Sequence, residues 1–335
     1  MTDPLLDLPK VELHCHLEGS MSSETVTALA HEQDVDWSWV WDGPIPDHFS
    51  FNDFPDFGRQ YLFGLSLLKG DGALATAIEA QARCLAEQRV GYTELTTTAY
   101  SHFIGGVSHE QYRDELNEGR RRASALGVDI GWVIDIPRDL EMPDSMVTIE
   151  YLESQLTPDA LVGIGLGGYE VGFPAAPYAE HFGRARALGL HALPHAGETE
   201  GADSVRQAVD LLGAERIGHG VRVLEDPELT ARIADVGILC EVCPTSNMLL
   251  GVVDHVDQHP LPRMLDAGLT VSVNTDDPGW FDTDLLTELS IATELGVDLD
   301  GHLRMQRAAL AASFAPDTVE RRIAEELDVF ERSHS

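Results

Sequence analysis

The sequence predicts an α/β fold in which one (β/α)8 barrel takes up the whole chain. Three observations predict it: eight short β-rich runs, helical spacing of apolar residues between the runs, and polar side chains where several runs end. A single barrel domain over residues 1–335 fits the length, because α/β barrels often run long as one domain. No linker or internal repeat interrupts the chain.

The eight candidate strands are VELHCH (11–16), YTELTT (92–97), VDIGWVID (128–135), LVGIGL (161–166), LHALPH (190–195), RIGHG (216–220), GILCEVC (237–243) and LTVSVNT (269–275). Between them apolar residues recur at three- and four-residue steps, as in Leu74, Ala77, Ile78, Ala82 and Leu85. Strands that alternate with helices favour a parallel barrel with right-handed crossovers. An open doubly wound sheet would normally carry G-x-G-x-x-G after its first strand, where this chain reads LEGSMS.

The first connection between strands is unusually long and rich in aromatic residues. Between positions 37 and 63 it carries Trp37, Trp39, Trp41, Phe49, Phe51, Phe54, Phe57, Tyr61 and Phe63. Two interpretations stay open at this point. The segment is either a satellite core under a long loop or a lid, because long βα connections border the active-site face of a barrel.

The chain is strongly acidic. Its 57 acidic and 22 basic residues give a formal net charge of −35, so nucleic acid and anionic membranes would be repelled. Such acidity fits adaptation to high salt, where screening removes the self-repulsion. With no signal-peptide pattern and no apolar stretch of roughly eighteen residues, we expect a cytoplasmic protein without membrane contact. A homo-oligomer is left open.

The four cysteines do not form a disulfide pattern. In a chain of this length, Cys15, Cys84, Cys240 and Cys243 fit reduced thiols in the cytoplasm. Cys240 and Cys243 lie in an apolar strand run rather than at a helix start, so we expect buried small residues instead of a redox pair.

His14 and His16 are the first candidate metal ligands. Residues two apart on a strand point to the same side, so both imidazoles project together while Cys15 faces away. Two imidazoles placed in this way can reach one ion at about 2.0–2.1 Å. Taken alone, the pair could also be ordinary buried histidines, so the remainder of the chain must decide.

Polar residues also follow other candidate strands. His195 and Glu198 follow the fifth strand, His219 the sixth, and Asp276 and Asp277 the eighth. The carboxyl ends of barrel strands form one face, so we expect these side chains to converge there. Three histidines and a carboxylate suit zinc, whose catalytic sites keep one position open for water. The sequence therefore predicts one zinc ion per subunit.

Five motifs resemble the adenosine deaminase branch of the amidohydrolase superfamily: VELHCHLEGS, HAGE, RIGHG, CPTSN and NTDDP. They occur in the family's order and span nearly the whole chain. The resemblance implies a TIM-type barrel and a zinc-dependent hydrolytic deaminase of a small purine nucleoside or base. Adenosine or deoxyadenosine is the first expected substrate, with inosine or its deoxy form and ammonia as products. Adenine and aminodeoxyfutalosine are the alternatives.

The resemblance also implies roles for the residues at the metal. The residues that look like zinc ligands are His14, His16, His195 and Asp276. Glu198 resembles the group that donates a proton to the purine N1, and His219 the group that positions and stabilises the attacking water. Asp276 is placed to take the proton of that water.

Three residues are implied to contact the substrate. Asp277 would share a proton with the purine N7, the backbone N–H of Gly168 would contact N3, and Glu18 would meet the sugar end. The chain departs from the family pattern here. Glu18 stands where adenosine deaminases usually carry aspartate and resembles the adenine deaminases, while Gly165 and Tyr169 replace the aspartates that flank the usual GDE motif.

Three rival functions fit the sequence less well. The H-x-E and C-x-x-C pieces of another zinc deaminase fold are present at His16–Glu18 and Cys240–Cys243, but about 220 residues separate them. A two-metal hydrolase commonly carries a carboxylated lysine after the fourth strand, where this chain reads LVGIGLGG. A non-catalytic barrel that only binds would be expected to lose a ligand or Glu198, and none is missing.

Overall fold

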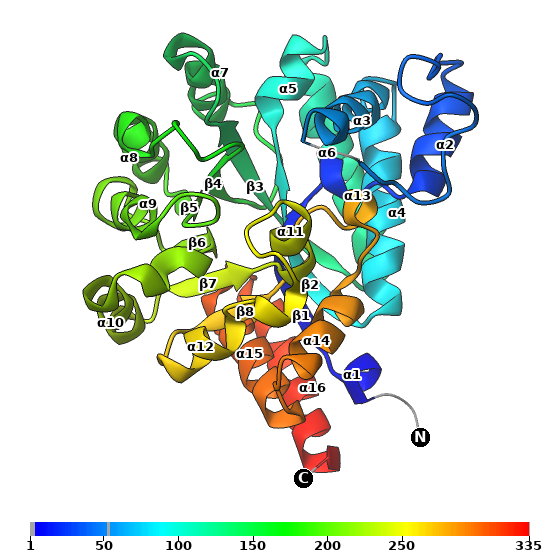
Figure 1. Cartoon of the computed structure of the whole chain (residues 1–335). Coiled ribbons are helices and arrows are strands. Elements are labelled where there is room, and N and C mark those ends of the chain that lie inside the picture. Colours follow the sequence, from blue (N-terminus) through cyan, green and yellow to red (C-terminus); the bar gives the residue numbers. More distant parts are fainter. Residues whose placement is uncertain (1–3, 52–53, 335) are drawn as a thin grey trace.

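The computed structural model describes residues 4–51 and 54–334, and within them eight strands form a barrel surrounded by helices (Figure 1). The strands pair in parallel and in chain order, which confirms the predicted (β/α)8 fold. They are β1 (Lys10–His16), β2 (Val90–Thr97), β3 (Asp129–Pro137), β4 (Leu161–Gly167), β5 (His191–Ala196), β6 (Arg216–His219), β7 (Leu239–Val242) and β8 (Val271–Val273). Each overlaps its predicted run, and only the ends differ by a few residues.

Helices fill the connections between the strands. In chain order they are α1 (Pro4–Asp7), α2 (Ser23–Glu32), α3 (Phe54–Leu67), α4 (Ala73–Glu87), α5 (Ala99–Ile104), α6 (His109–Ala125), α7 (Met142–Leu152), α8 (Ala179–Ala187), α9 (Ala202–Gln207), α10 (Pro227–Val236), α11 (Pro244–Leu249), α12 (Leu261–Asp266), α13 (Pro278–Phe281), α14 (Leu285–Glu294), α15 (Leu299–Ala312) and α16 (Asp317–His334). Short 3₁₀ helices are η1 (Glu18–Ser20), η2 (Ala176–Tyr178), η4 (Val221–Glu225) and η5 (Val256–Gln258), and η3 (Ala208–Leu212) is a short π-helix.

Local sequence explains where several helices begin. The residues whose side chains cap α2, α6, α10, α14 and α15 are Ser22, Ser108, Asp226, Asp284 and Asp298. Each side-chain oxygen accepts a hydrogen bond from a first-turn N–H that has no partner within its helix. The strands are held by burial instead, since β1, β6, β7 and β8 are buried along their whole length.

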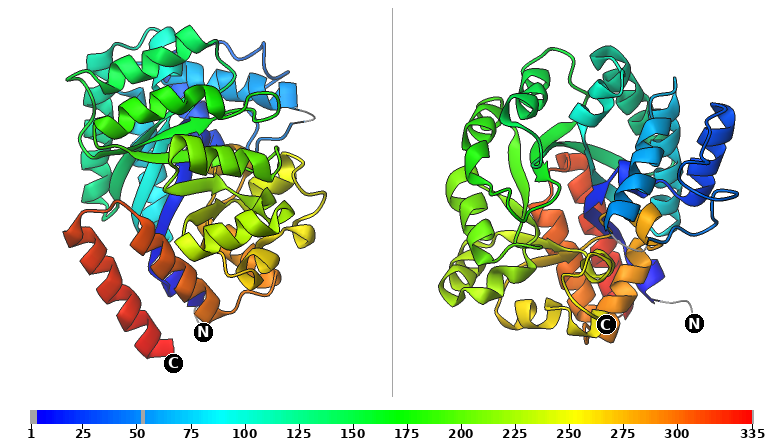
Figure 2. Two further views of the ribbon diagram at one scale, coloured as in Figure 1. Left: turned by 90° about the vertical axis from the view of Figure 1, so that its left-hand side faces the viewer. Right: turned by 45° about the horizontal axis from the view of Figure 1, so that its top comes forward.

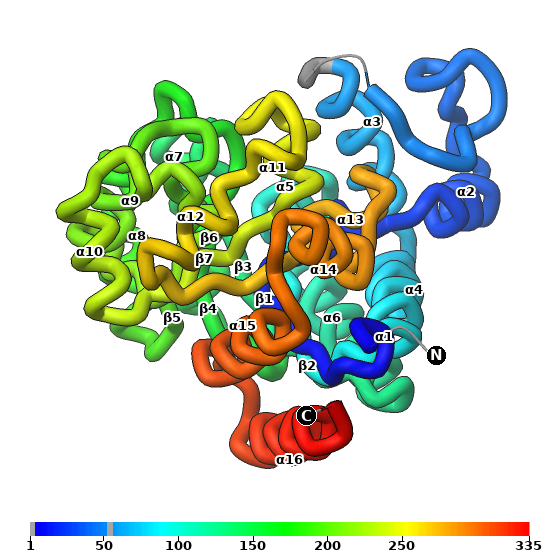
Figure 3. Tube along the Cα trace, turned by 60° about the horizontal axis from the view of Figure 1, so that its bottom comes forward, coloured from blue at the N-terminus to red at the C-terminus, as the bar shows by residue number. Residues whose placement is uncertain are grey.

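The last two helices close the amino-terminal end of the barrel. Figure 2 (left) and Figure 3 show α15 and α16 beside that end of the strands. Leu303 of α15 and Tyr92 of β2 belong to the same cluster of buried hydrophobic residues. In the following turn, the N–H of Phe314 donates to Glu94, and the Arg216 guanidinium stacks on the Phe314 ring. The carboxyl ends of the strands, at the opposite end of the barrel, border the cavity that contains the residues predicted from sequence.

The aromatic segment after β1 lies partly in the core and partly at the cavity. Phe49 stacks on Trp280 with 4.1 Å between ring centroids, and Phe63 is fully buried in the main core. Phe57 and Tyr61 of α3 instead line the cavity at the open end of the barrel. The segment is therefore a satellite core in one part and a cavity wall in another. Residues 52–53 and the side chain of Phe54 lie outside the described part.

The cysteines are free, and three of them are buried, as expected for small core residues. Cys15 faces α4, where Gln81 donates a hydrogen bond to its sulfur at 3.6 Å. Cys243 donates to the carbonyl of Glu241 at 3.6 Å. Among the residues described, no helix is long and apolar enough to cross a membrane.

The barrel closes between β8 and β1 through an isolated bridge that involves Asp276. The N–H of His16 donates to the carbonyl of Asp276 at 2.7 Å, and the N–H of Asp276 donates to the carbonyl of His14 at 3.0 Å. Just before this point, β1 carries one extra residue between Glu12 and Cys15, which is a β-bulge. The seam of the barrel thus joins residues that the sequence predicts to bind metal.

Candidate active site

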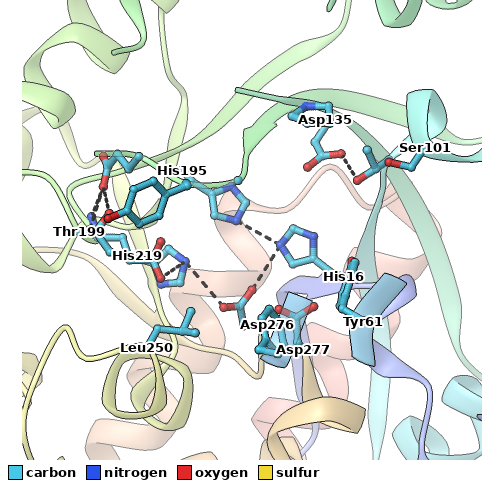
Figure 4. Close-up of a pocket in the computed structure, with 17 residues that line it drawn as sticks. His16, Tyr61, Ser101, Asp135, His195, Thr199, His219, Leu250, Asp276 and Asp277 are labelled. Carbon is cyan, nitrogen blue, oxygen red and sulfur yellow. Dashed lines mark hydrogen bonds and ion pairs between the residues drawn. The ribbon is translucent and has the colours of Figure 1, made fainter. Parts of the chain in front are cut away.

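Four side chains converge where β1, β5 and β8 end: His14, His16, His195 and Asp276. Their ligand atoms all lie within 4.8 Å of one another. Nε2 of His16 lies 3.1 Å from Nε2 of His195 and 3.3 Å from Asp276 Oδ1 (Figure 4). Nε2 of His14 also lies 3.3 Å from Asp276 Oδ1. Nε2 of His14 is buried and has no hydrogen-bond partner. Three imidazoles and a carboxylate arranged in this way fit a metal ion.

The backbone is strained at two of the residues in this region. Asp276 and His219 have φ angles of 66° and 60°, in the left-handed region that residues other than glycine rarely adopt. Each such conformation costs on the order of 1–3 kcal/mol, and it persists only where the surrounding structure holds it. Asp276 is kept in this conformation by its two backbone hydrogen bonds to β1.

Buried partners orient the candidate ligands. Nδ1 of His14 lies 3.0 Å from Oε2 of Glu241, and the other oxygen of Glu241 accepts from Nε of Arg216 at 2.6 Å. Burial opposes ionisation of Glu241, but Arg216 and His14 outweigh it and lower the pKa of this carboxyl. The hydroxyl of Ser246 donates to Asp276 Oδ2 at 2.6 Å. His14 therefore keeps its Nε2 lone pair for a metal, and Asp276 keeps a fixed orientation.

Glu170 fixes the loop that carries Glu198. Its carboxylate accepts hydrogen bonds from four consecutive backbone N–H groups, those of residues 197–200, at 2.7–3.0 Å, and from the hydroxyl of Ser204. Burial opposes ionisation of Glu170, but these donors outweigh it and lower its pKa. Sequence reasoning missed this residue. The signal was the glutamate of GGYE directly after the fourth strand.

Glu198 and His219 face the metal cluster from the side. Nε2 of His219 lies 3.6 Å from Glu198 Oε1 and 3.9 Å from Asp276 Oδ2. Burial, together with the charges of Asp276 and Glu170, raises the pKa of Glu198 to about 8, so its carboxyl is protonated at neutral pH. Burial lowers the pKa of His219 to about 4, so its imidazole is neutral.

A cavity of about 280 Å³ opens above these groups at the carboxyl ends of the strands. Its metal-side wall is formed by residues labelled in Figure 4, among them His16, His195 and Asp276, and Leu250 lies across from Asp135. Aromatic side chains of α3 and Tyr169 form part of the rim. Five of the lining side chains are carboxylic acids: Asp135, Glu170, Glu198, Asp276 and Asp277. No described lining residue is lysine or arginine.

Two of the three residues expected at the substrate line this cavity. Gly168 lines it with a φ of 86°, and Asp277 lines it beside Asp276. Burial and the charge of Asp276 raise the pKa of Asp277 to about 7. The carboxylate of Asp277 occupies the space where a Cβ at position 19 would lie, so this turn requires Gly19.

Glu18 is placed differently from the expectation, because it is not among the residues that line the cavity. Its carboxylate is buried behind the wall and accepts hydrogen bonds from the hydroxyl of Thr97 at 2.7 Å and the N–H of Thr98 at 3.0 Å. Nε2 of His102 lies 2.7 Å from the same oxygen. Through this oxygen Glu18 braces the end of β2, while its other oxygen, Oε2, is buried without a hydrogen-bond partner.

Asp135, at the end of β3, is a cavity carboxylate that sequence reasoning missed. Its Oδ1 accepts a hydrogen bond from the hydroxyl of Thr98 at 2.6 Å. A Cβ at position 165 would lie 2.9 Å from the Cβ of Asp135, so Gly165 leaves the room that this side chain fills. The departure from the family pattern at Gly165 was the signal, but the sequence did not show which neighbour fills the space.

Comparison with known proteins agrees with this geometry. A family model described as adenosine deaminase matches residues 9–330. The chain belongs to the adenosine deaminase family. Like that family, it is a hydrolytic deaminase that acts on the amidine C–N bond of adenine-type substrates.

Named relatives in the family differ in their substrates. The aminodeoxyfutalosine deaminase of Streptomyces avermitilis is 38% identical, over 96% of this chain and 91% of the relative. The adenine deaminase of Rhodospirillum rubrum is 36% identical, over 92% of each.

Solved structures with the same fold include adenine deaminase from Arthrobacter aurescens, with a TM-score of 0.91 and 27% identity over 97% of this chain and 99% of that one. A zinc-bound amidohydrolase from Burkholderia ambifaria superposes with a TM-score of 0.84 at 23% identity, over 98% and 93% of the two chains.

Removal of a ligand should remove the metal. We expect His16→Ala to lower bound metal more than about tenfold, because even residues that only orient ligands typically change affinity 10–100-fold. Cys15→Ala is the matched control, since its side chain faces α4. Elemental analysis of both purified variants provides the measurement. Equal metal content in the two variants would contradict the assignment of His16.

Proposed function

We propose that this chain uses zinc to deaminate an uncharged 6-aminopurine nucleoside, with adenosine as the simplest substrate. The observation that carries the proposal is the buried carboxyl of Glu198 beside three imidazoles and Asp276 at the floor of a cavity, where burial raises its pKa to about 8. A carboxylic acid kept neutral at pH 7 can donate a proton to a ring nitrogen as negative charge develops there.

The residues that would hold zinc are His14, His16, His195 and Asp276, and their donor atoms match those of catalytic zinc sites with one open position. Zinc bound there would lower the pKa of a water molecule and so supply hydroxide at neutral pH. Cys243 lies close enough to His219 and Asp276 to join them in a second possible metal group, but burial raises the pKa of its thiol, which disfavours the thiolate.

The chain's own residues divide the remaining work. Asp276 Oδ2 faces the space between the metal cluster and His219, where it can accept a proton from the attacking water. Glu198 donates its proton to N1 when C6 is attacked, which stabilises the tetrahedral intermediate. Asp277, with a pKa of about 7, can share a proton with N7. Gly168, which lines the cavity and is exposed, would contact N3 through its backbone N–H.

The charge of the cavity favours a substrate without phosphate. Asp135 lines the wall away from the metal cluster, and no described lining residue is lysine or arginine, so a phosphate group on that side would lack a basic counterion. Plant relatives of the fold are described as N6-methyl-AMP deaminase or as complexes with IMP and GMP. The acidic cavity supports a different preference for this chain.

The far wall of the cavity supports a nucleoside over a free base. Thr98, Ser101 and Asp135 line it, and Figure 4 shows Ser101 and Asp135 across His16 from Asp276. Two hydroxyls and a carboxylate there offer hydrogen bonds to sugar hydroxyls, whereas adenine alone has no hydroxyl for them. These three side chains would bind the sugar in place of Glu18, whose carboxylate is buried behind the wall.

A second candidate activity is that of the named relatives, on adenine or on a 5′-modified nucleoside such as aminodeoxyfutalosine. The identities of 36–38% to enzymes with those names favour it. Phe57, Tyr61 and Tyr169 at the rim also offer apolar surface to an aromatic 5′ substituent.

A substrate panel separates these candidates. Adenosine, deoxyadenosine, adenine, aminodeoxyfutalosine and AMP should be offered to the zinc-loaded wild-type protein at high salt, with ammonia release as the readout. We expect kcat/KM for adenosine to exceed that for AMP at least about 100-fold, because unpaired like charges cost several kcal/mol. Preference for AMP would contradict the uncharged-substrate proposal, and no turnover of any 6-aminopurine would contradict the deaminase proposal.

Replacement of Glu198 tests the proton donor. Glu198→Gln should lower kcat about 10²–10⁴-fold, the usual contribution of general acid catalysis, with metal content unchanged. Glu200→Gln is the matched control, because Glu200 lies on the same loop and its side chain does not line the cavity. Retained activity in Glu198→Gln, or equal losses in both variants, would show that another group donates the proton.

The raised pKa of Glu198 also sets the pH above which deamination should slow. Because the protonated carboxyl is the active form and its pKa is about 8, kcat/KM should fall about tenfold per pH unit above that pH. Initial rates measured across the alkaline range give the profile, and circular dichroism at each pH controls for unfolding. A profile that stays flat to about pH 10 would contradict this role.

A further inference from the structure

A chain of hydrogen bonds leads from a backbone N–H to the ring of His219. The N–H of Leu261, at the start of α12, donates to Nδ1 of His259 at 3.2 Å. Nε2 of His259 lies 3.1 Å from Oδ1 of Asn247, and Nδ2 of Asn247 lies 3.1 Å from Nδ1 of His219. The three side chains are at most 3% exposed. Water therefore has little access to these hydrogen bonds and cannot easily replace them.

The direction of every bond in this chain follows from its first donor. A backbone N–H can only donate, so Nδ1 of His259 accepts and carries no proton. The proton of His259 must then be on Nε2, which donates to Asn247 and requires the amide oxygen at that position. The amide NH2 of Asn247 consequently points at His219 and donates to its Nδ1.

We infer that Asn247 and His259 are positioning residues that hold His219 in the tautomer with its proton on Nε2. This inference rests on the proposed function for its catalytic meaning, but the tautomer itself follows from the hydrogen bonds alone. Nε2 is the ring atom that faces Glu198 and Asp276, at 3.6 and 3.9 Å. His219 thus presents an N–H donor to the space where the attacking water would lie.

The tautomer divides the catalytic roles. A ring nitrogen that already carries a proton cannot take another proton from water without becoming a buried cation, so His219 orients the water and stabilises the charge that develops on it. Asp276, whose Oδ2 faces the same space, is left as the proton acceptor. The CPTSN motif therefore supplies two neighbouring supports, since Ser246 holds Asp276 and Asn247 holds His219.

The direct test is the protonation of the His219 ring nitrogens, measured by ¹⁵N NMR on histidine-labelled protein. The chain contains 14 histidines, so His219→Asn and His259→Gln assign the two signals, and His255→Gln, at an exposed neighbour, is the control. We expect protonated Nε2 and unprotonated Nδ1 in both rings of the wild-type protein. Protonated Nδ1 in His219 would overturn the inference, whether or not the protein is active.

Variants then connect the tautomer to the rate. Asn247→Asp replaces the donor by a carboxylate of the same shape, so Nδ1 of His219 should become protonated. We expect kcat to fall about 10²–10³-fold, comparable to the loss of one oxyanion donor, with KM for adenosine nearly unchanged. His259→Gln keeps a donor for Asn247 and should retain most of kcat, whereas His259→Phe removes that donor and should lose more.

The outcomes separate the two proposals. A wild-type protein that deaminates no 6-aminopurine contradicts the proposed function, and the NMR signals still decide the tautomer. An active wild-type protein in which Asn247→Asp keeps both the rate and the His219 signals contradicts the inference alone. Should Asn247→Asp fail to fold, the comparison of His259→Gln with His259→Phe and the wild-type spectrum still decides.

Discussion

The closure of the barrel between β8 and β1 is the contact on which the site depends. Two backbone hydrogen bonds join Asp276 to His14 and His16 there, so the seam that completes the sheet also brings three candidate ligands together. Asp276 adopts a left-handed conformation at this seam, and its cost is offset by those bonds. The same hydrogen bonds therefore close the barrel and assemble the site, because loss of the seam would separate the first strand from the eighth.

Buried polar networks reach the site from opposite ends of the barrel. From the amino-terminal end, Arg216 joins Glu94 and Glu241, and Glu241 orients His14. From the open end, Glu170 holds the loop of Glu198 through four backbone donors. Removal of one partner from a buried ion pair typically costs about 3–5 kcal/mol. Such networks are expensive to disturb, and they keep the reacting groups at fixed positions.

The eight strands and the convergence of His14, His16, His195 and Asp276 could be predicted from the sequence. Alternation of side chains along β1 is a local property, and the common face of the strands' carboxyl ends follows from the barrel topology. Sequence reasoning could not predict the surroundings of Glu18 or the cavity position of Asp135. Those depend on contacts between side chains of different strands, such as the room that Gly165 leaves beside Asp135. The directional chain from His259 to His219 was also missed, since its members lie on three separate segments.

The central claim is that three imidazoles and one carboxylate hold a single zinc ion at the seam. X-ray absorption at the zinc edge of the loaded protein measures this directly. We expect nitrogen and oxygen neighbours at about 2.0–2.2 Å, with the multiple scattering of imidazole rings. A sulfur neighbour at about 2.3 Å would instead implicate Cys243, and a second metal at about 3.5–4 Å would indicate a two-metal hydrolase. Either result would contradict the account.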